Sequence, residues 1–100
     1  MSLPIILTEE AEDEYREAYS RYENARTGAG RKLEANLRAT FHVLSRNPLI
    51  GRVVLADVRM KVVPRHPYTI YYRILADRIS VLAVFHTSRD PGEWRRRVEP

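Results

Sequence analysis

The stretch from Tyr68 to Phe85 reads YTIYYRILADRISVLAVF, and it decides the fold class of this chain. It contains two runs, 68–74 and 79–85, that are rich in the branched and aromatic residues typical of β-strands. Ala76 and Asp77 lie between the runs and predict a tight turn. The second run is apolar at nearly every position, as in a central strand that is covered on both faces. The sequence therefore predicts an antiparallel pair at the centre of a sheet.

Two further runs, both earlier in the sequence than this pair, also predict strands. VRMKVV at 58–63 has the same composition and extends the pair to a meander of three consecutive strands. LPIIL at 3–7 is short and apolar, and Pro4 indicates that this strand lies at an edge or begins just after the proline. The sheet is therefore expected to contain four strands.

The segment between the first strand and the meander shows the spacing of amphipathic helices. Thr8 is a predicted N-cap, because a run of carboxylates follows it, and alanines and tyrosines at spacings of three and four predict a helix over about 9–26. A second apolar stripe predicts a helix from Ala29 to about Ser45, ended by Asn47 and Pro48. The TGAG sequence at 27–30 separates the two helices, so they form a hairpin.

The predicted order is strand, helix, helix, strand, strand, strand, with a short helix after Asp90. This order indicates an α+β fold, in which a helical hairpin packs on one face of a mainly antiparallel sheet. A chain of 100 residues is expected to form a single domain over residues 1–100.

Composition excludes several classes of protein. The chain has no cysteine, so disulfides, thiolate metal sites and a cysteine nucleophile are excluded. No apolar run approaches the roughly 18 residues of a membrane span, and the N-terminus lacks a basic secretion signal, so a cytoplasmic protein is expected. His42 and His66 show no metal-binding spacing with His86, so neither a metal nor another cofactor is expected.

The positive charge lies in the second half of the chain. Residues 51–100 carry 10 basic and 5 acidic side chains, whereas residues 1–50 carry 7 and 8. Basic residues on the strands and tail are expected to converge at one sheet face and to bind nucleic acid or an acidic protein segment, with a solvated polar face as the alternative. The candidates, with Trp94, are Arg59, Lys61, Arg65, Arg73, Arg89, Arg95, Arg96 and Arg97.

The segment VFHTSRDPGEWRRR at 84–97 gathers several reactive side chain types. His86, Ser88 and Asp90 are too close in sequence for the relay geometry of a catalytic triad. Asp90 instead suits an N-cap with Glu93 reaching back in a capping box. His86 is either a general acid or base or a plain hydrogen-bonding group. In the first helix, Tyr15, Tyr19 and Tyr22 indicate core packing, and they are candidate partner contacts where they escape the core.

Three ordered motifs together carry a family resemblance. NPLIGR follows the helical hairpin, VVPRHPYTIYYRI contains the middle strand, and ISVLAVFHTSRDPGEWRRR ends the chain. In this order they resemble the RelE/ParE superfamily of toxins from type II toxin-antitoxin systems, and especially its ParE-like branch. The resemblance spans nearly the whole chain, and the α+β fold that it implies agrees with the fold predicted from the periodicity.

The resemblance implies two different activities. RelE-like toxins cleave mRNA on the ribosome, and matching their pattern gives Arg59, Lys61 and Arg89 as basic site residues, with His86 as a substitute proton carrier. ParE-like toxins inhibit DNA gyrase without known cleavage chemistry. This chain has Thr69 where the nuclease pattern has an arginine and Trp94 where it has a tyrosine.

Neither departure supplies nuclease chemistry, because threonine carries no positive charge and indole cannot transfer protons. The resemblance therefore favours a gyrase-inhibiting toxin of the plasmid-stabilisation type, which a cognate antitoxin neutralises in a hetero-oligomer. A ribosome-dependent endoribonuclease and a non-toxic binding module of the same fold remain the alternatives.

Overall fold

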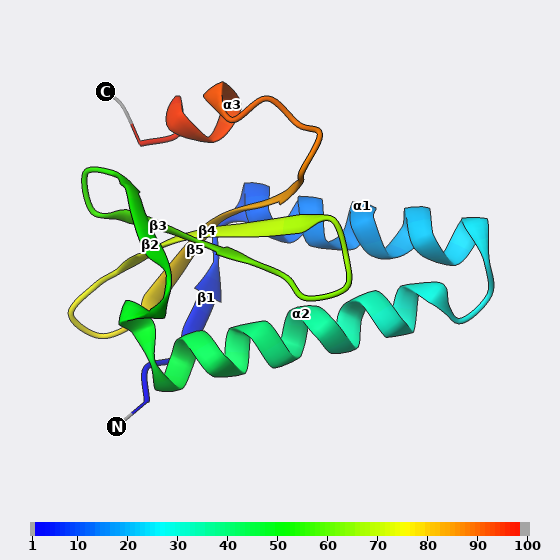
Figure 1. The fold of residues 1–100 in the computed structure, drawn as a ribbon, viewed down its shortest axis with the longest axis horizontal. Helices are drawn as coiled ribbons and strands as arrows, with labels where there is room; N and C mark the ends of the chain where they lie inside the picture. The colour runs from blue at the N-terminus through cyan, green and yellow to red at the C-terminus, as the bar shows by residue number, and fades with distance from the viewer. Residues whose placement is uncertain (1, 99–100) are drawn as a thin grey trace.

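The computed structural model describes residues 2–98, and its centre is a five-stranded sheet in the order β1-β5-β4-β3-β2 (Figure 1). The strands are β1 (Ile5–Leu7), β2 (Arg52–Leu55), β3 (Val58–Val62), β4 (Tyr68–Ile74) and β5 (Ile79–His86). β1 runs parallel to β5, and all other neighbours are antiparallel. The predicted meander and its tight turn are confirmed, since the Leu75 amide donates to the Arg78 carbonyl at 2.8 Å.

The predicted helical hairpin is also confirmed. α1 (Glu9–Ala25) and α2 (Ala29–Arg46) pack on one face of the sheet. Thr8 is the N-cap of α1, because its hydroxyl accepts from the Ala11 amide at 3.2 Å. α2 ends at the residue before Asn47, as the following proline requires.

The four-strand prediction was wrong by one strand. β2 (Arg52–Leu55) pairs with β3 across a tight turn at Ala56, whose φ of 49° is left-handed. The strand has only four residues and a mixture of exposed and half-buried positions, so it shows no alternation that a sequence reading detects. A short turn of 3-10 helix, η1 (Pro48–Ile50), joins α2 to β2.

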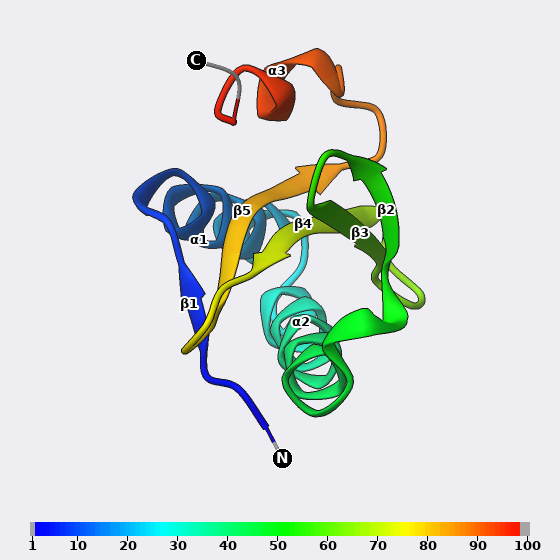
Figure 2. The ribbon, with the colours of Figure 1, turned by 90° about the vertical axis from the view of Figure 1, so that its left-hand side faces the viewer.

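The sheet is covered on both faces, as the apolar character of β5 predicts. One core lies between the sheet and the two helices and includes Leu33, Leu37 and Ile70. The second core lies on the opposite face and includes Leu82, Phe85 and Trp94. Trp94 belongs to α3 (Gly92–Arg95), so the C-terminal segment covers the face that the hairpin leaves free (Figure 2). No helix among residues 2–98 has the length and apolar character of a membrane span.

Candidate functional site

A carboxylate from α1 ties the C-terminal segment to the sheet. Glu14 is only 9% exposed, and its oxygens accept from Arg97 Nη2 at 2.6 Å and from Arg89 Nη1 at 2.9 Å. The Val84 amide donates a third hydrogen bond at 3.0 Å. A buried carboxylate is tolerated when charged donors and backbone amides surround it, as they do here. The name Glu14 cluster is used below for Glu14, Arg89 and Arg97.

Further contacts extend the Glu14 cluster. Both guanidinium groups lie over the Phe85 ring, at 4.1 Å for Arg89 and 5.0 Å for Arg97. Arg89 also pairs with Glu93 at 2.7 Å. The hydrogen bond from Arg89 lowers the pKa of the Glu93 carboxyl, so this pairing is present at neutral pH and is lost as the pH falls through the lowered value.

Trp94 packs in the second core and presents no free ring. Its side chain is 1% exposed, and it stacks on Tyr71 with 4.5 Å between the ring centroids. Its indole nitrogen is buried without an acceptor among residues 2–98, which costs part of the free energy that the packing gains. Trp94 therefore anchors the C-terminal segment, and its predicted role in binding a target has no exposed surface to act through.

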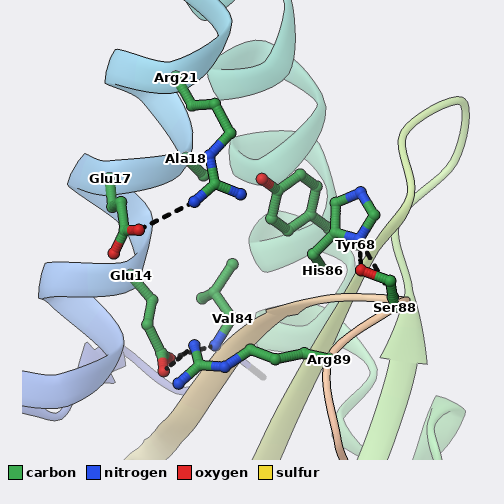
Figure 3. Close-up of a pocket in the computed structure, with 9 residues that line it drawn as sticks. All are labelled: Glu14, Glu17, Ala18, Arg21, Tyr68, Val84, His86, Ser88 and Arg89. Carbon is green, nitrogen blue, oxygen red and sulfur yellow. Dashed lines mark hydrogen bonds and ion pairs between the residues drawn. The ribbon is translucent and has the colours of Figure 1, made fainter.

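A polar cleft of about 300 Å³ opens beside the Glu14 cluster, between α1 and the end of β5 (Figure 3). Charged and hydrogen-bonding side chains face it from both elements. Its lining consists of Glu14, Glu17, Ala18, Arg21, Tyr68, Val84, His86, Ser88 and Arg89. The positive and negative side chains are paired with each other, because Arg21 binds Glu17 at 2.9 Å and Arg89 binds Glu14.

His86 is held in one tautomer at the mouth of this cleft. Its Nδ1 accepts from the Ser88 amide at 3.1 Å and contacts the Ser88 hydroxyl at 2.8 Å. An amide can only donate, so Nδ1 carries the lone pair and the neutral ring carries its proton on Nε2. Ser88 and His86 are thus in contact, whereas the Asp90 carboxylate turns toward the Gly92 amide, so no triad forms.

The predicted capping box does not form, because the N-cap position is Pro91, one residue later than predicted, and it has no side-chain cap. Asp90 Oδ1 still accepts from the Gly92 amide at 2.9 Å, so the carboxylate stabilises the turn that leads into α3. Glu93 does not reach back to Asp90, because it pairs with Arg89 instead. The helix begins at Gly92 and has only four residues.

Replacing Asp90 with alanine is expected to lower the free energy of unfolding by about 0.5 to 2 kcal/mol, because the Gly92 amide loses its acceptor. Asp90→Ser, which retains an acceptor oxygen, should remain close to wild type. Urea unfolding followed by Trp94 fluorescence measures both variants. Loss of activity in both variants without loss of stability would instead give the carboxylate a functional role.

The strand arginines do not converge, so that prediction was wrong. Arg59 pairs across the sheet with Tyr72, on the face that the helices cover, whereas Arg73 lies on the opposite face and binds Asp57 at 2.8 Å. Arg59 Nη1 donates to the Gly51 carbonyl at 2.7 Å. Successive side chains of a strand point to opposite faces of the sheet. Arg73 follows Tyr72, the partner of Arg59, so the two arginines point to opposite faces.

The predicted basic residues therefore fall into two groups. Those that hold the fold are Arg59, Arg73, Arg89 and Arg97. Those without an ion pair among residues 2–98 are Lys61, Arg65, Arg95 and Arg96. Charge reversal at Arg73 or Arg89 consequently breaks an ion pair within the fold, so its effect on the binding of a partner cannot be measured separately.

The three tyrosines of α1 are half-buried. The Tyr15 hydroxyl donates to Glu34 at 3.0 Å, and burial raises the pKa of this phenol. Tyr22 packs against Tyr68 and His66. Tyr19 lines an open cleft with Tyr15, formed by residues of α1 and by Glu34 of α2. Packing therefore accounts for Tyr15 and Tyr22, and part of Tyr19 remains accessible. Residues 2–98 contain no group of three metal-ligating side chains.

Comparisons with known proteins identify one family and show one fold. The family model described as ParE toxin of type II toxin-antitoxin system, parDE, matches residues 5–91. A solved structure from the chromosomal ParDE system of P. aeruginosa superposes with a TM-score of 0.74 at 18% identity, covering 85% of this chain and 96% of that chain. A chain from the RelBE2 toxin-antitoxin complex of Mycobacterium tuberculosis gives 0.62 at 23% identity, covering 86% and 99%.

The two structural matches have low sequence identity and establish the shared fold. No curated protein sequence matches this chain. The family model spans most of the chain and carries the assignment. This chain belongs to the ParE toxin family of type II toxin-antitoxin systems.

Proposed function

We propose that this toxin inhibits DNA gyrase and that a cognate antitoxin neutralises it. One observation carries the choice of gyrase over RNA cleavage: three of the four candidate nuclease side chains already bind other groups of the fold. Arg89 pairs with Glu14, Arg59 donates to the Gly51 carbonyl, and the lone pair of His86 Nδ1 accepts from Ser88.

Cleavage by a 2'-hydroxyl requires a base, an acid and cations around the phosphate. His86 offers no free lone pair, since Nε2 carries the proton of the neutral ring and Nδ1 accepts from Ser88. Arg59 is directed at backbone carbonyls, and Thr69 is buried within the sheet. These contacts support a toxin that inhibits its target by binding to it and not by cleaving RNA.

The antitoxin part of the proposal is supported by charge and by the fold. The chain has a net charge of +4, and its positive side chains are concentrated in the second half. An acidic antitoxin segment that folds on binding suits such a surface. The relatives in the two solved structures come from toxin-antitoxin systems. A toxin-antitoxin hetero-oligomer in the cytoplasm, where gyrase acts, follows from the proposal.

A RelE-like endoribonuclease is the second candidate. The observation that favours it is the cleft beside β5, where His86, Ser88 and Arg89 lie together. Lys61 and Arg59 lie on a different part of the sheet, however, and line no part of that cleft. A non-toxic binding module is the third candidate, and growth arrest on expression without a partner would exclude it.

The purified protein is expected to inhibit gyrase supercoiling and to leave mRNA intact in a translating extract. His86→Ala should reduce gyrase inhibition by less than about tenfold, because no proton transfer is lost, whereas removing a general acid or base costs about 10² to 10⁴ in rate. Supercoiling assays and primer extension on the extract's mRNA measure the two activities. Cleavage of ribosome-bound mRNA that His86→Ala abolishes would assign the protein to the nuclease branch.

Truncation of the chain before Trp94 is a poor test of the same question. The deletion removes the residue that packs on Tyr71 and also removes Arg97 from the Glu14 cluster. It therefore uncovers the second core, so any loss of activity combines unfolding with loss of contacts.

A further inference from the structure

The turn that joins α2 to β2 is held by two side chains of the sheet. The Tyr72 hydroxyl donates to the Pro48 carbonyl at 2.7 Å and accepts from the Gly51 amide at 3.0 Å. Arg59 Nη1 donates to the Gly51 carbonyl at 2.7 Å and to the Leu49 carbonyl at 3.3 Å. Tyr72 is fully buried, so this turn is fixed against the sheet.

The fixed turn presents two apolar side chains to solvent. Leu49 is 67% exposed and Ile50 is 45% exposed. A single exposed leucine is ordinary, but two neighbours on an immobilised backbone form a preorganised apolar contact. Preorganisation matters because a partner then loses less conformational entropy when it binds.

An apolar cleft of about 200 Å³ lies beside this turn, between α2 and β3. Aliphatic carbons form most of its wall, which consists of Ala39, Val43, Ile50 and Pro64 with Asn36, Thr40 and Lys61. Val43 is itself 40% exposed. The side chain of Lys61 makes no hydrogen bond or ion pair to residues 2–98, so its ammonium group is available at the rim. Leu49, the cleft and Lys61 are called the α2–β3 surface below.

Lys61 is the charged side chain in the lining of the α2–β3 surface, and the lining includes no carboxylate. In the sequence, residues 36–76 contain seven basic side chains and one acidic one, Asp57. Asp57 pairs with Arg73 on the other face of the sheet. A second copy of this chain would bring like charges together here, whereas an acidic segment is attracted.

We infer that the α2–β3 surface binds an acidic segment of the cognate antitoxin, whose apolar side chains pack on Leu49 and enter the cleft while a carboxylate pairs with Lys61. The inference rests on the antitoxin pairing of the proposed function and adds the place of contact. Buried apolar anchors with a charged rim are the usual anatomy of such interfaces.

The test uses the full-length chain and, as the probe, the purified product of the reading frame beside its gene. Leu49→Asp and Lys61→Glu should each weaken binding of that product by about tenfold or more, because each places a negative charge where an acidic apolar segment docks. Raising the salt concentration should weaken binding of the wild type more than binding of Lys61→Glu. Isothermal titration calorimetry measures the dissociation constants.

Val62→Asp is the matched control. Val62 is 51% exposed and follows Lys61 in β3, but it pairs with Thr69 and so lies on the opposite face of the sheet. The affinity of Val62→Asp for the neighbouring gene product should remain within about twofold of the wild-type affinity. This difference is well under the tenfold that corresponds to 1.4 kcal/mol. Equal weakening in all three variants would reveal a general charge effect and overturn the inference.

Two further outcomes separate this inference from the proposed function. Tight binding of the wild type that neither Leu49→Asp nor Lys61→Glu weakens would overturn the α2–β3 surface and leave the antitoxin pairing intact. Absence of binding by the wild type would overturn the pairing and this inference together. Hydrogen exchange of the wild-type complex gives a measurement without substitutions: protection at Leu49, Ile50 and 61–63 is expected, and unchanged exchange there contradicts the inference.

Discussion

Glu14→Ala is expected to lower the free energy of unfolding by about 3 kcal/mol, one of the largest single-residue effects in this chain. The substitution leaves the guanidinium groups of Arg89 and Arg97 facing each other without their shared carboxylate. It also removes the acceptor of the Val84 amide. The value lies at the low end for a buried ionic cluster, because Arg89 is 36% exposed and water replaces part of the lost interaction.

Thermal and urea unfolding of the wild type and Glu14→Ala measure this effect. A loss of about 3 kcal/mol corresponds to a fall in Tm of roughly 10 to 20 °C for a domain of this size. Trp94 is the only tryptophan, so its fluorescence reports directly on the segment that the Glu14 cluster holds. Release of the segment should expose the indole ring and shift its emission to longer wavelength.

Glu17→Ala is the matched control, because Glu17 is on the same helix and also pairs with an arginine. That pair is exposed on both sides, so its loss should change stability by no more than about 0.5 kcal/mol. The loss of stability in Glu14→Gln should lie between the losses in Glu14→Ala and Glu17→Ala, since glutamine keeps an acceptor for the Val84 amide but carries no charge. Equal stability of Glu14→Ala and Glu17→Ala would contradict a structural role for the Glu14 cluster.

The sequence predicts the fold well where a local pattern is strong. The apolar run of β5 and the spacing in α1 each carry enough information to identify an element and its bounds. β2 (Arg52–Leu55) carries little, since four residues show too short a pattern and its ladder to β3 shifts register after Val53. Its position at the edge is set by pairing with β3, which is a tertiary contact.

The candidate site is predicted less well, because ion pairs between distant segments leave no mark on local sequence. Arg89 and Arg97 appear in the sequence as members of a basic tail, and only the fold brings them to a carboxylate on α1. One signal was available and was missed. Glu14 follows Ala11 by three residues and precedes Ala18 by four, so it lies in the apolar stripe of the helix. A carboxylate in such a stripe indicates a buried charge that needs partners.

Gly51→Ala is expected to destabilise the protein by roughly 2 to 4 kcal/mol, through overpacking and lost hydrogen bonds. The φ of Gly51 is −73°, which any residue adopts, so the effect is steric. A methyl group at this position would meet the Tyr72 hydroxyl and would lie 2.7 Å from the Met60 carbonyl oxygen. To make room, the phenol must leave the Gly51 amide and the Pro48 carbonyl, which frees the turn that carries Leu49 and Ile50.

Urea unfolding of Gly51→Ala, Tyr72→Phe and the double variant resolves the cause. Tyr72→Phe removes the clashing oxygen, so adding Gly51→Ala to it should cost less than Gly51→Ala costs in the wild type, by about 0.5 to 3 kcal/mol of coupling. Gly92→Ala is the control, because its methyl group would meet only the exposed Asp90 carboxylate at 3.3 Å. That change should be neutral or stabilise α3 by up to about 1 kcal/mol. Additive costs in the double variant would show that the Tyr72 hydroxyl does not set the close approach of the turn to the sheet.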